Sequence, residues 1–152
     1  MNLLIDTNII LNIIRSRDYR GIIEFINPEN RSIYISVVSE AEIKSIAKRS
    51  NWGSARIEKL DNFLDTVAIV EINHQYINSY VEIDTYSQKS NPLFEEYGFS
   101  TPRNMGKNDL WIASLAGLLG LQLITTDADF DHLDGIFFEV RRITPTELSR
   151  FY

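Results

Sequence analysis

Hydrophobic residues gather in short runs that end at polar residues, a pattern typical of buried parallel strands. The first run, Asn2-Leu3-Leu4-Ile5, stops at Asp6-Thr7-Asn8 before Ile9 begins a new apolar stretch. Residues 1–6 are therefore predicted to form the first strand, around which the rest of the chain is organised. Further strands are predicted at residues 32–38, 67–70, 121–125 and, as an edge strand, 135–140.

Between these runs the apolar residues recur at helical spacing, as Ile43, Ile46 and Ala47 do. Gly120 is placed to end one helix and Pro145 to start another. Strands that alternate with helices predict an α/β fold with a parallel doubly wound sheet and helices on both faces, as a single domain over residues 1–152. The helices are predicted at residues 9–16, 20–26, 39–49, 57–64, 73–83, 109–119 and 145–151.

The alternation lapses over residues 87–107, which contain Pro92, Gly98, Pro102 and Gly106. A loop of this length inside a compact domain is usually functional or mobile. We expect its aromatic residues to pack back on the body of the protein and the segment to be mobile.

Composition narrows the function classes. The chain has no cysteine, so disulfides and thiolate metal sites are excluded. No run is long enough to span a membrane and no basic segment precedes the first apolar stretch, which predicts a soluble cytoplasmic protein. The formal net charge of -6 argues against a broad basic surface for nucleic acid. Local basic clusters, such as Lys44, Lys48 and Arg49, are interpreted as solvated surface.

Four carboxylates each follow a predicted strand or open a predicted helix on the same side of the sheet: Asp6, Glu42, Asp109 and Asp127. Each also has a purely structural interpretation. Asp6 suits a turn or a helix cap, and Asp109 suits a helix start. The spacings Ser39–Glu42 and Thr126–Asp129 match capping boxes. Taken singly the structural interpretations are favoured, but they leave unexplained why all four acids converge.

Such convergence is costly, because two carboxylates about 4 Å apart repel by roughly 4 kcal/mol at an effective dielectric constant near 20. A hard divalent cation relieves the repulsion, and Mg²⁺ or Mn²⁺ suits carboxylate ligands. Zn²⁺ is disfavoured, since Cys is absent and His74 and His132, interpreted as surface residues, lack ligand spacing. A bound cation can activate water and hold phosphate oxygens, which points to phosphodiester hydrolysis.

Four segments carry a family resemblance. They are Leu4-Ile5-Asp6-Thr7-Asn8-Ile9, the stretch from Ile35 to Ile43, Asn108-Asp109-Leu110-Trp111-Ile112-Ala113, and the stretch from Leu123 to Phe130. In this order and context the chain resembles a PIN domain, most closely the VapC-type toxins of bacterial toxin–antitoxin pairs. The stretch between Ile83 and Asp109 is longer than in compact members of that family.

The resemblance implies a metal-dependent endoribonuclease that acts on RNA, possibly tRNA, and is usually dimeric and neutralised by a small antitoxin protein. It implies that Asp6, Glu42, Asp109 and Asp127 are the catalytic, metal-binding acids. The supporting residues would be Asn8 and Thr126, with Asp129 as a fifth, peripheral acid.

The main alternative is a non-catalytic PIN-like module that binds RNA or protein. A phosphatase of the haloacid-dehalogenase type fits less well, because Asn8 stands where a second Asp is needed. A response-regulator receiver would need an acid after the third strand that Val70-Glu71-Ile72-Asn73 does not offer in the right place. The apolar helices at 9–14 and 22–26 are interpreted either as buried within the domain and a homodimer or as part of a groove for an antitoxin helix.

Overall fold

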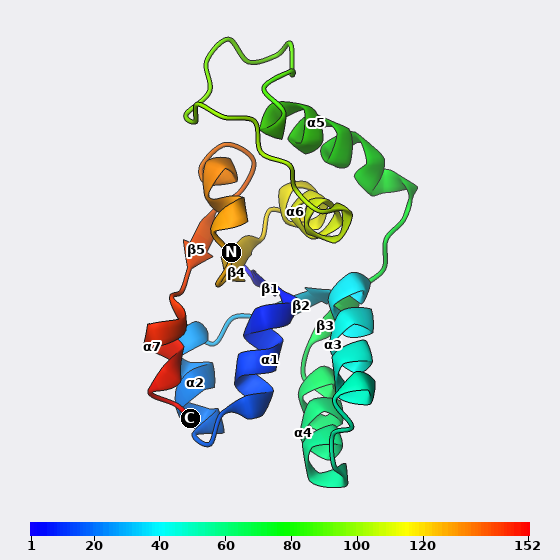
Figure 1. Cartoon of the computed structure of the whole chain (residues 1–152), viewed down its shortest axis with the longest axis vertical. Coiled ribbons are helices and arrows are strands. Elements are labelled where there is room, and N and C mark those ends of the chain that lie inside the picture. The colour runs from blue at the N-terminus through cyan, green and yellow to red at the C-terminus, as the bar shows by residue number, and fades with distance from the viewer.

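The computed structural model describes residues 1–152 and has the expected α/β architecture (Figure 1). Five strands form one sheet in the order β3-β2-β1-β4-β5, and every neighbouring pair is parallel. The order confirms a doubly wound sheet whose direction of winding reverses between β1 and β4. The strands are β1 Leu3–Ile5, β2 Ile33–Ser36, β3 Ala68–Val70, β4 Gln122–Thr125 and β5 Val140–Arg142.

Helices cover both faces of the sheet. Alternate residues of β1 point to opposite faces, and all three are apolar and buried. Leu3 and Ile5 pack into one hydrophobic core with α1, α2, α3, α4 and α7. Leu4 packs into a second core with α5, α6 and the 3₁₀ helices η1 and η2. The helices are α1 Thr7–Arg15, α2 Tyr19–Ile26, α3 Val37–Arg49, α4 Ser54–Asp65, η1 His74–Tyr76, α5 Ile77–Ser87, α6 Lys107–Leu119, η2 Ala128–Leu133 and α7 Pro145–Ser149. None of these helices is both long and apolar enough to cross a membrane.

The isoleucines of α1 are buried within this chain, whereas Leu11 is half-buried. Ile9, Ile10, Ile13 and Ile14 are all buried, because α1 lies between the sheet and the neighbouring helices α2, α3 and α4. A second apolar stripe on α1 therefore needs no partner subunit to cover it. On α2, Ile22 and Ile26 are buried as well, whereas Ile23 and Phe25 are only half-buried.

Several element boundaries differ from the sequence prediction; for example, the helix predicted at 73–83 is divided into η1 and α5, and α5 extends to Ser87. Helix α3 begins at Val37, not at 39, because the Ser36 hydroxyl accepts a hydrogen bond from the Val38 N–H and caps the helix early. Helix α6 begins at Lys107 after Gly106, so Asn108 is not its cap. The last strand is β5, Val140–Arg142, and not 135–140, since the chain turns at Gly135 with φ of 73° before it joins the sheet.

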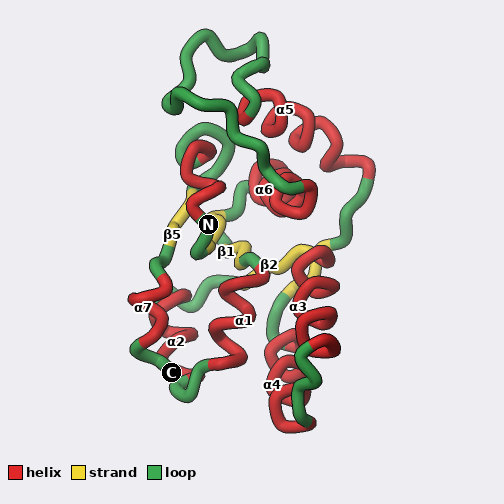
Figure 2. The backbone as a smooth tube through the Cα atoms, viewed as in Figure 1, coloured by secondary structure: helices red, strands yellow, loops and turns green.

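The long loop between α5 and α6 lies along one end of the molecule (Figure 2). As expected, its aromatic residues pack back on the body: the rings of Phe94, Tyr97 and Phe99 surround buried Tyr86, with centroid separations of 4.6 to 5.5 Å. The interpretation of His132 as a surface residue is wrong. Its ring is half-buried, stacks with Tyr86, and its Nε2 lies 2.7 Å from the hydroxyl of buried Ser87.

Candidate metal centre

The candidate site lies at the carboxyl ends of β1 and β4, where open α/β sheets form their ligand-binding crevice. Asp6 follows β1 directly, and Asp127 comes two residues after the end of β4. The Asp6 N–H donates to the Ile124 carbonyl at 3.3 Å, so the pairing of the two strands continues to the edge of the site. Parallel pairing therefore brings together two acids that are far apart in sequence.

Asp6 is both a helix cap and a member of the site. It is buried, and its Oδ1 accepts a hydrogen bond from the Ile9 N–H at 3.1 Å, which caps α1. Its Oδ2 accepts a hydrogen bond from the hydroxyl of Thr125. The carboxylate is thus fixed from two sides before any ligand binds.

Thr125 was not identified from the sequence, where Thr126 and Asn8 were expected to support the acids. Thr125 is fully buried; it donates to Asp6, and its Oγ1 accepts from the Asp127 N–H at 3.0 Å. The side chains of Asn8 and Thr126 form no hydrogen bond within the chain. The sequence signal for this role is the position of Thr125, a threonine that ends a buried apolar strand directly before an Asp-rich turn.

Glu42 is held by a residue on α1. Its Oε1 accepts a hydrogen bond from the Thr7 hydroxyl at 2.8 Å, a contact between residues 35 positions apart that no local pattern predicts. Because α3 begins at Val37, Glu42 lies in the second turn of the helix, and the expected Ser39–Glu42 capping box does not form. Ser39 is buried, and its hydroxyl has no hydrogen-bond partner.

A close group of carboxylates consists of Asp109, Asp127 and Asp129, and one oxygen of each lies within 4.8 Å of one oxygen of the other two. Asp109 stands in the first turn of α6, and the other two flank the start of η2. The Asp127 Oδ1 accepts from the Asp129 N–H at 2.9 Å, so Asp127 is the cap and the expected Thr126–Asp129 box is absent. Asp129, expected as a peripheral acid, is thus as close to the group as the others.

Burial and mutual repulsion raise the pKa of two of these acids. Burial raises the pKa of Asp6 from 3.8 to about 6, against the hydrogen bonds from Thr125 and Ile9, and the charges of Asp109 and Asp127 add to the rise. Both hydrogen bonds favour the ionised form of Asp6, so desolvation is the dominant cause.

The pKa of Asp109 is also raised from 3.8 to about 6, first by burial and then by the charges of Asp127, Asp129 and Glu42. Through these couplings the five acids form one electrostatic unit. None of the five forms an ion pair with a Lys, Arg or His, because the four ion pairs of the chain use Glu24, Glu29, Glu40 and Asp131. The negative charge is therefore left without a basic partner in the chain.

This donor set fits a hard divalent cation. It consists of carboxylate oxygens from four segments, converging at a strand edge and uncompensated by basic side chains, which is the chemistry that Mg²⁺ or Mn²⁺ prefers. Three oxygens within 4.8 Å of one another are also close enough to share one ion after small side-chain rotations. An acidic site of this kind can hold a cation next to a phosphate group.

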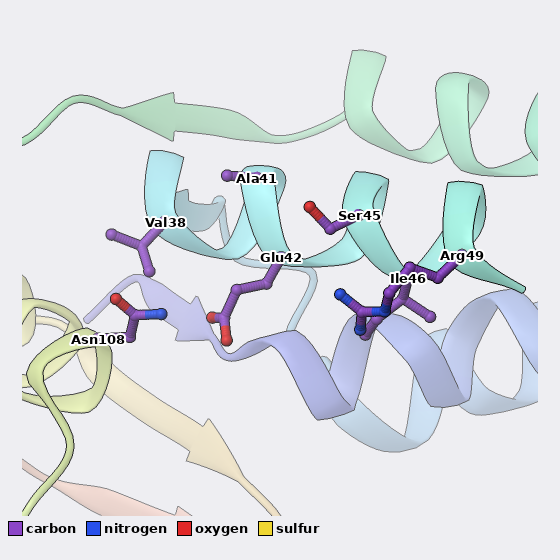
Figure 3. A pocket seen from close by; sticks show the side chains of 7 residues that line it. All are labelled: Val38, Ala41, Glu42, Ser45, Ile46, Arg49 and Asn108. Carbon is purple, nitrogen blue, oxygen red and sulfur yellow. The ribbon is translucent and has the colours of Figure 1, made fainter.

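A groove of about 370 Å³ opens beside Glu42 and runs along α3 (Figure 3). Asn108, at the start of α6, lies across from Glu42, and Arg49 lines the groove further along α3. The groove thus joins the acidic site to a basic side chain. Its lining residues are Val38, Ala41, Glu42, Ser45, Ile46, Arg49 and Asn108.

Solved structures with a similar fold come from bacterial toxin–antitoxin complexes. The first, VapBC2 from Rickettsia felis bound to a promoter DNA fragment, has a TM-score of 0.72 and 24% identity over 93% of this chain and 98% of that chain. VapBC-1 from nontypeable Haemophilus influenzae has a TM-score of 0.71 and 24% identity, again over 93% and 98% of the two chains. A toxin–antitoxin complex from Klebsiella pneumoniae has a TM-score of 0.65 and 20% identity over 94% of this chain and 99% of that chain.

Comparison with curated protein sequences gives no significant match. The family model of the PIN domain, however, matches residues 3–136, which include all five acids and the sheet up to β4. This match agrees with the strand order, the acidic site at the point where the winding reverses, and the fold shared with the VapBC complexes. The chain belongs to the PIN-domain family.

Proposed function

We propose that this chain is a metal-dependent endoribonuclease, the VapC-type toxin of a type II toxin–antitoxin pair, built as one PIN domain over residues 1–152 and acting in the cytoplasm. The observation that carries the proposal is the convergence of five carboxylates without a basic partner at the reversal point of the sheet. A module that only binds other molecules gains nothing from this repulsion. A nuclease gains a cation site next to the bond it cleaves.

Asp6, Glu42, Asp109 and Asp127 are proposed as the catalytic, metal-binding acids, with Asp129 as a further ligand. Mg²⁺ or Mn²⁺ bound there would neutralise charge on the phosphodiester and activate water. Thr125 and Thr7 serve as positioning residues, because their hydroxyls fix the Asp6 and Glu42 carboxylates. Their role is to hold the two carboxylates in place, so that the site can bind an ion without rearranging.

The likeness to VapBC complexes supports a small antitoxin protein as the partner. RNA, possibly tRNA, is proposed as the substrate. A homodimer is proposed as the assembly. Because the isoleucines of α1 are buried within the chain, as are Ile22 and Ile26 of α2, the half-buried Leu11, Ile23 and Phe25 are among the apolar residues that these helices still offer to an antitoxin segment. The antitoxin is expected to suppress RNA cleavage when the two proteins are expressed together.

The test compares RNA cleavage by the purified chain in Mg²⁺, in Mn²⁺ and in EDTA, with Asp109→Asn as the inactive variant and Asp61→Asn on exposed α4 as the matched control. We expect cleavage only with metal, lost in Asp109→Asn and kept in the control. Cleavage by Asp109→Asn at the wild-type rate would refute the assignment of the site.

The melting temperature in Mg²⁺, measured together with RNA cleavage, separates this proposal from its alternative. A chain that is stabilised by Mg²⁺ through these acids, yet cleaves no RNA in any metal, would be a non-catalytic PIN module. A chain that is neither stabilised nor active would contradict the metal site itself.

A further inference from the structure

We propose that the groove along α3, with Arg49 at its far end, binds a phosphate of the RNA strand next to the bond that is cleaved. The inference rests on the proposed nuclease function and assigns a substrate-binding role to Arg49, which the sequence places among solvated surface charges. The groove is lined by Glu42 of the acidic site toward one end and by Arg49 toward the other (Figure 3).

The residues of α3 that line the groove form one stripe of the helix. Glu42 and Arg49 are seven positions apart, which places them about 10 Å apart along the helix axis on the same side. The side chain of Arg49 turns back along α3 toward Glu42 (Figure 3). A strand held at the acidic site would therefore bring its neighbouring phosphate within reach of the guanidinium.

The polar groups of this groove are free to bind a ligand. Ser45, Arg49 and Asn108 are all exposed, and none of their side chains forms a hydrogen bond within the chain. Arg49 is also absent from the four ion pairs, although Lys44 on the same helix pairs with Glu40. The guanidinium thus makes no bond within the chain that would compete with a ligand in the groove.

The chemistry of the groove selects a phosphate. A guanidinium binds phosphate oxygens in a bidentate, charge-assisted manner, while an amide and a hydroxyl can bond to a phosphate or a ribose hydroxyl. A chain with a net charge of -6 and an acidic site repels a polyanion, so a cation beside the site is needed to hold the strand. Arg49 is the basic residue that shares a groove with Glu42.

The neighbouring residue Lys48 provides a matched control. It is exposed on the same helix with the same charge, but it lines a separate groove between α3 and α4, together with Trp52 and Asp61. Arg49→Gln and Lys48→Gln therefore remove equal charge one position apart, and only the first removes a donor from the proposed site. Arg49→Lys keeps the charge and loses the bidentate geometry.

The experiment measures binding of a fluorescein-labelled single-stranded oligoribonucleotide of random sequence by anisotropy, in an Asp109→Asn background that leaves the RNA intact, over a range of salt concentrations. We expect Arg49→Gln to weaken binding about tenfold and to reduce the slope of log K against log salt by about 0.7, the loss of one phosphate contact. Lys48→Gln should weaken binding by no more than about twofold, with Arg49→Lys between the two. In the otherwise native enzyme, Arg49→Gln should raise KM by the same factor and leave kcat nearly unchanged.

Equal effects of Arg49→Gln and Lys48→Gln would overturn the inference, since they would show only general electrostatic attraction. The same holds if Arg49→Gln leaves RNA binding unchanged and weakens only antitoxin binding, which would make the groove a protein contact. In both cases a native enzyme that still cleaves RNA with metal leaves the proposed function standing. If the native chain neither binds nor cleaves RNA, both the function and this inference are wrong.

Discussion

Replacing Asp6 by Asn should stabilise the metal-free protein, which is an unusual result for a buried, hydrogen-bonded residue. Asn has the same shape as Asp, caps helices equally well, and can still accept the Ile9 N–H. Its amide can donate to the Thr125 hydroxyl in place of the bond that Thr125 now donates to Asp6. The substitution therefore removes the charge and keeps the contacts.

The magnitude follows from the pKa of Asp6, which rises from 3.8 to about 6 on folding. An acid whose pKa rises on folding holds more protons in the native state between those two values, so stability falls as pH increases through this range. At about pH 7.5 the ionised carboxylate costs roughly 3 kcal/mol, and at about pH 4.5 the cost has fallen to roughly 1 kcal/mol. Asp6→Asn should raise the free energy of unfolding by about the corresponding amount at each pH, reduced by any cost of weaker hydrogen bonds to the amide.

The assay is urea denaturation in EDTA at both pH values, followed by circular dichroism, with Asp61→Asn on exposed α4 as the control. The control should change the free energy of unfolding by no more than about 0.5 kcal/mol at either pH. Saturating Mg²⁺ should then stabilise the wild type more than Asp6→Asn, because binding to the native state adds RT ln(1 + [Mg²⁺]/Kd). A variant that is less stable than wild type at pH 7.5, or whose advantage does not shrink toward pH 4.5, would refute the electrostatic reasoning.

Further outcomes are expected from the same site and its surroundings. Thr125→Val should lower the free energy of unfolding by about 1–2 kcal/mol in urea denaturation, because it leaves the Asp127 N–H and the Asp6 carboxylate without their shared partner. Ser39→Ala should leave the melting temperature unchanged or raise it, since the buried Ser39 hydroxyl has no partner and Ala favours the helix. Metal affinity measured by calorimetry should fall as the pH drops through about 6, because Asp6 and Asp109 must lose their protons to bind an ion and both have a pKa of about 6. Backbone amides of residues 88–106 should exchange with solvent faster than those of the strands, and slow exchange throughout would contradict the expected mobility of this loop.

The sequence was most informative where local pattern determines structure. The apolar run at Leu3–Ile5 and its polar stop at Asp6 predicted both the central strand and the edge on which the acids converge. Helix caps were less predictable, because Ser36 and Ser39 are both plausible N-caps and only Ser36 accepts the Val38 N–H. The two valines between them favour a strand by propensity, so the predicted helix starts two residues too late.

The supporting bonds of the site were out of reach because they join distant parts of the chain. Thr125 bonds to Asp6 across 119 positions, and Thr7 bonds to Glu42 across 35. Either threonine looks ordinary in its own segment, and neighbouring Thr126 looks the same. The choice between them depends on which threonine is level with Asp6, and the register that pairs Ile5 with Ile124 places Thr125 there.

Structural and functional interpretations of these acids turn out not to be alternatives. Asp6 caps α1 and Asp127 caps η2, while Asp109 stands in the first turn of α6. A helix N-terminus carries partial positive charge and unpaired N–H groups, so it stabilises a carboxylate. The fold thus places its acids at the positions where an ionised group costs least, and desolvation still raises the pKa of Asp6 and Asp109 to about 6. Capping alone does not account for that remaining cost, and the cation proposed for this site would offset it.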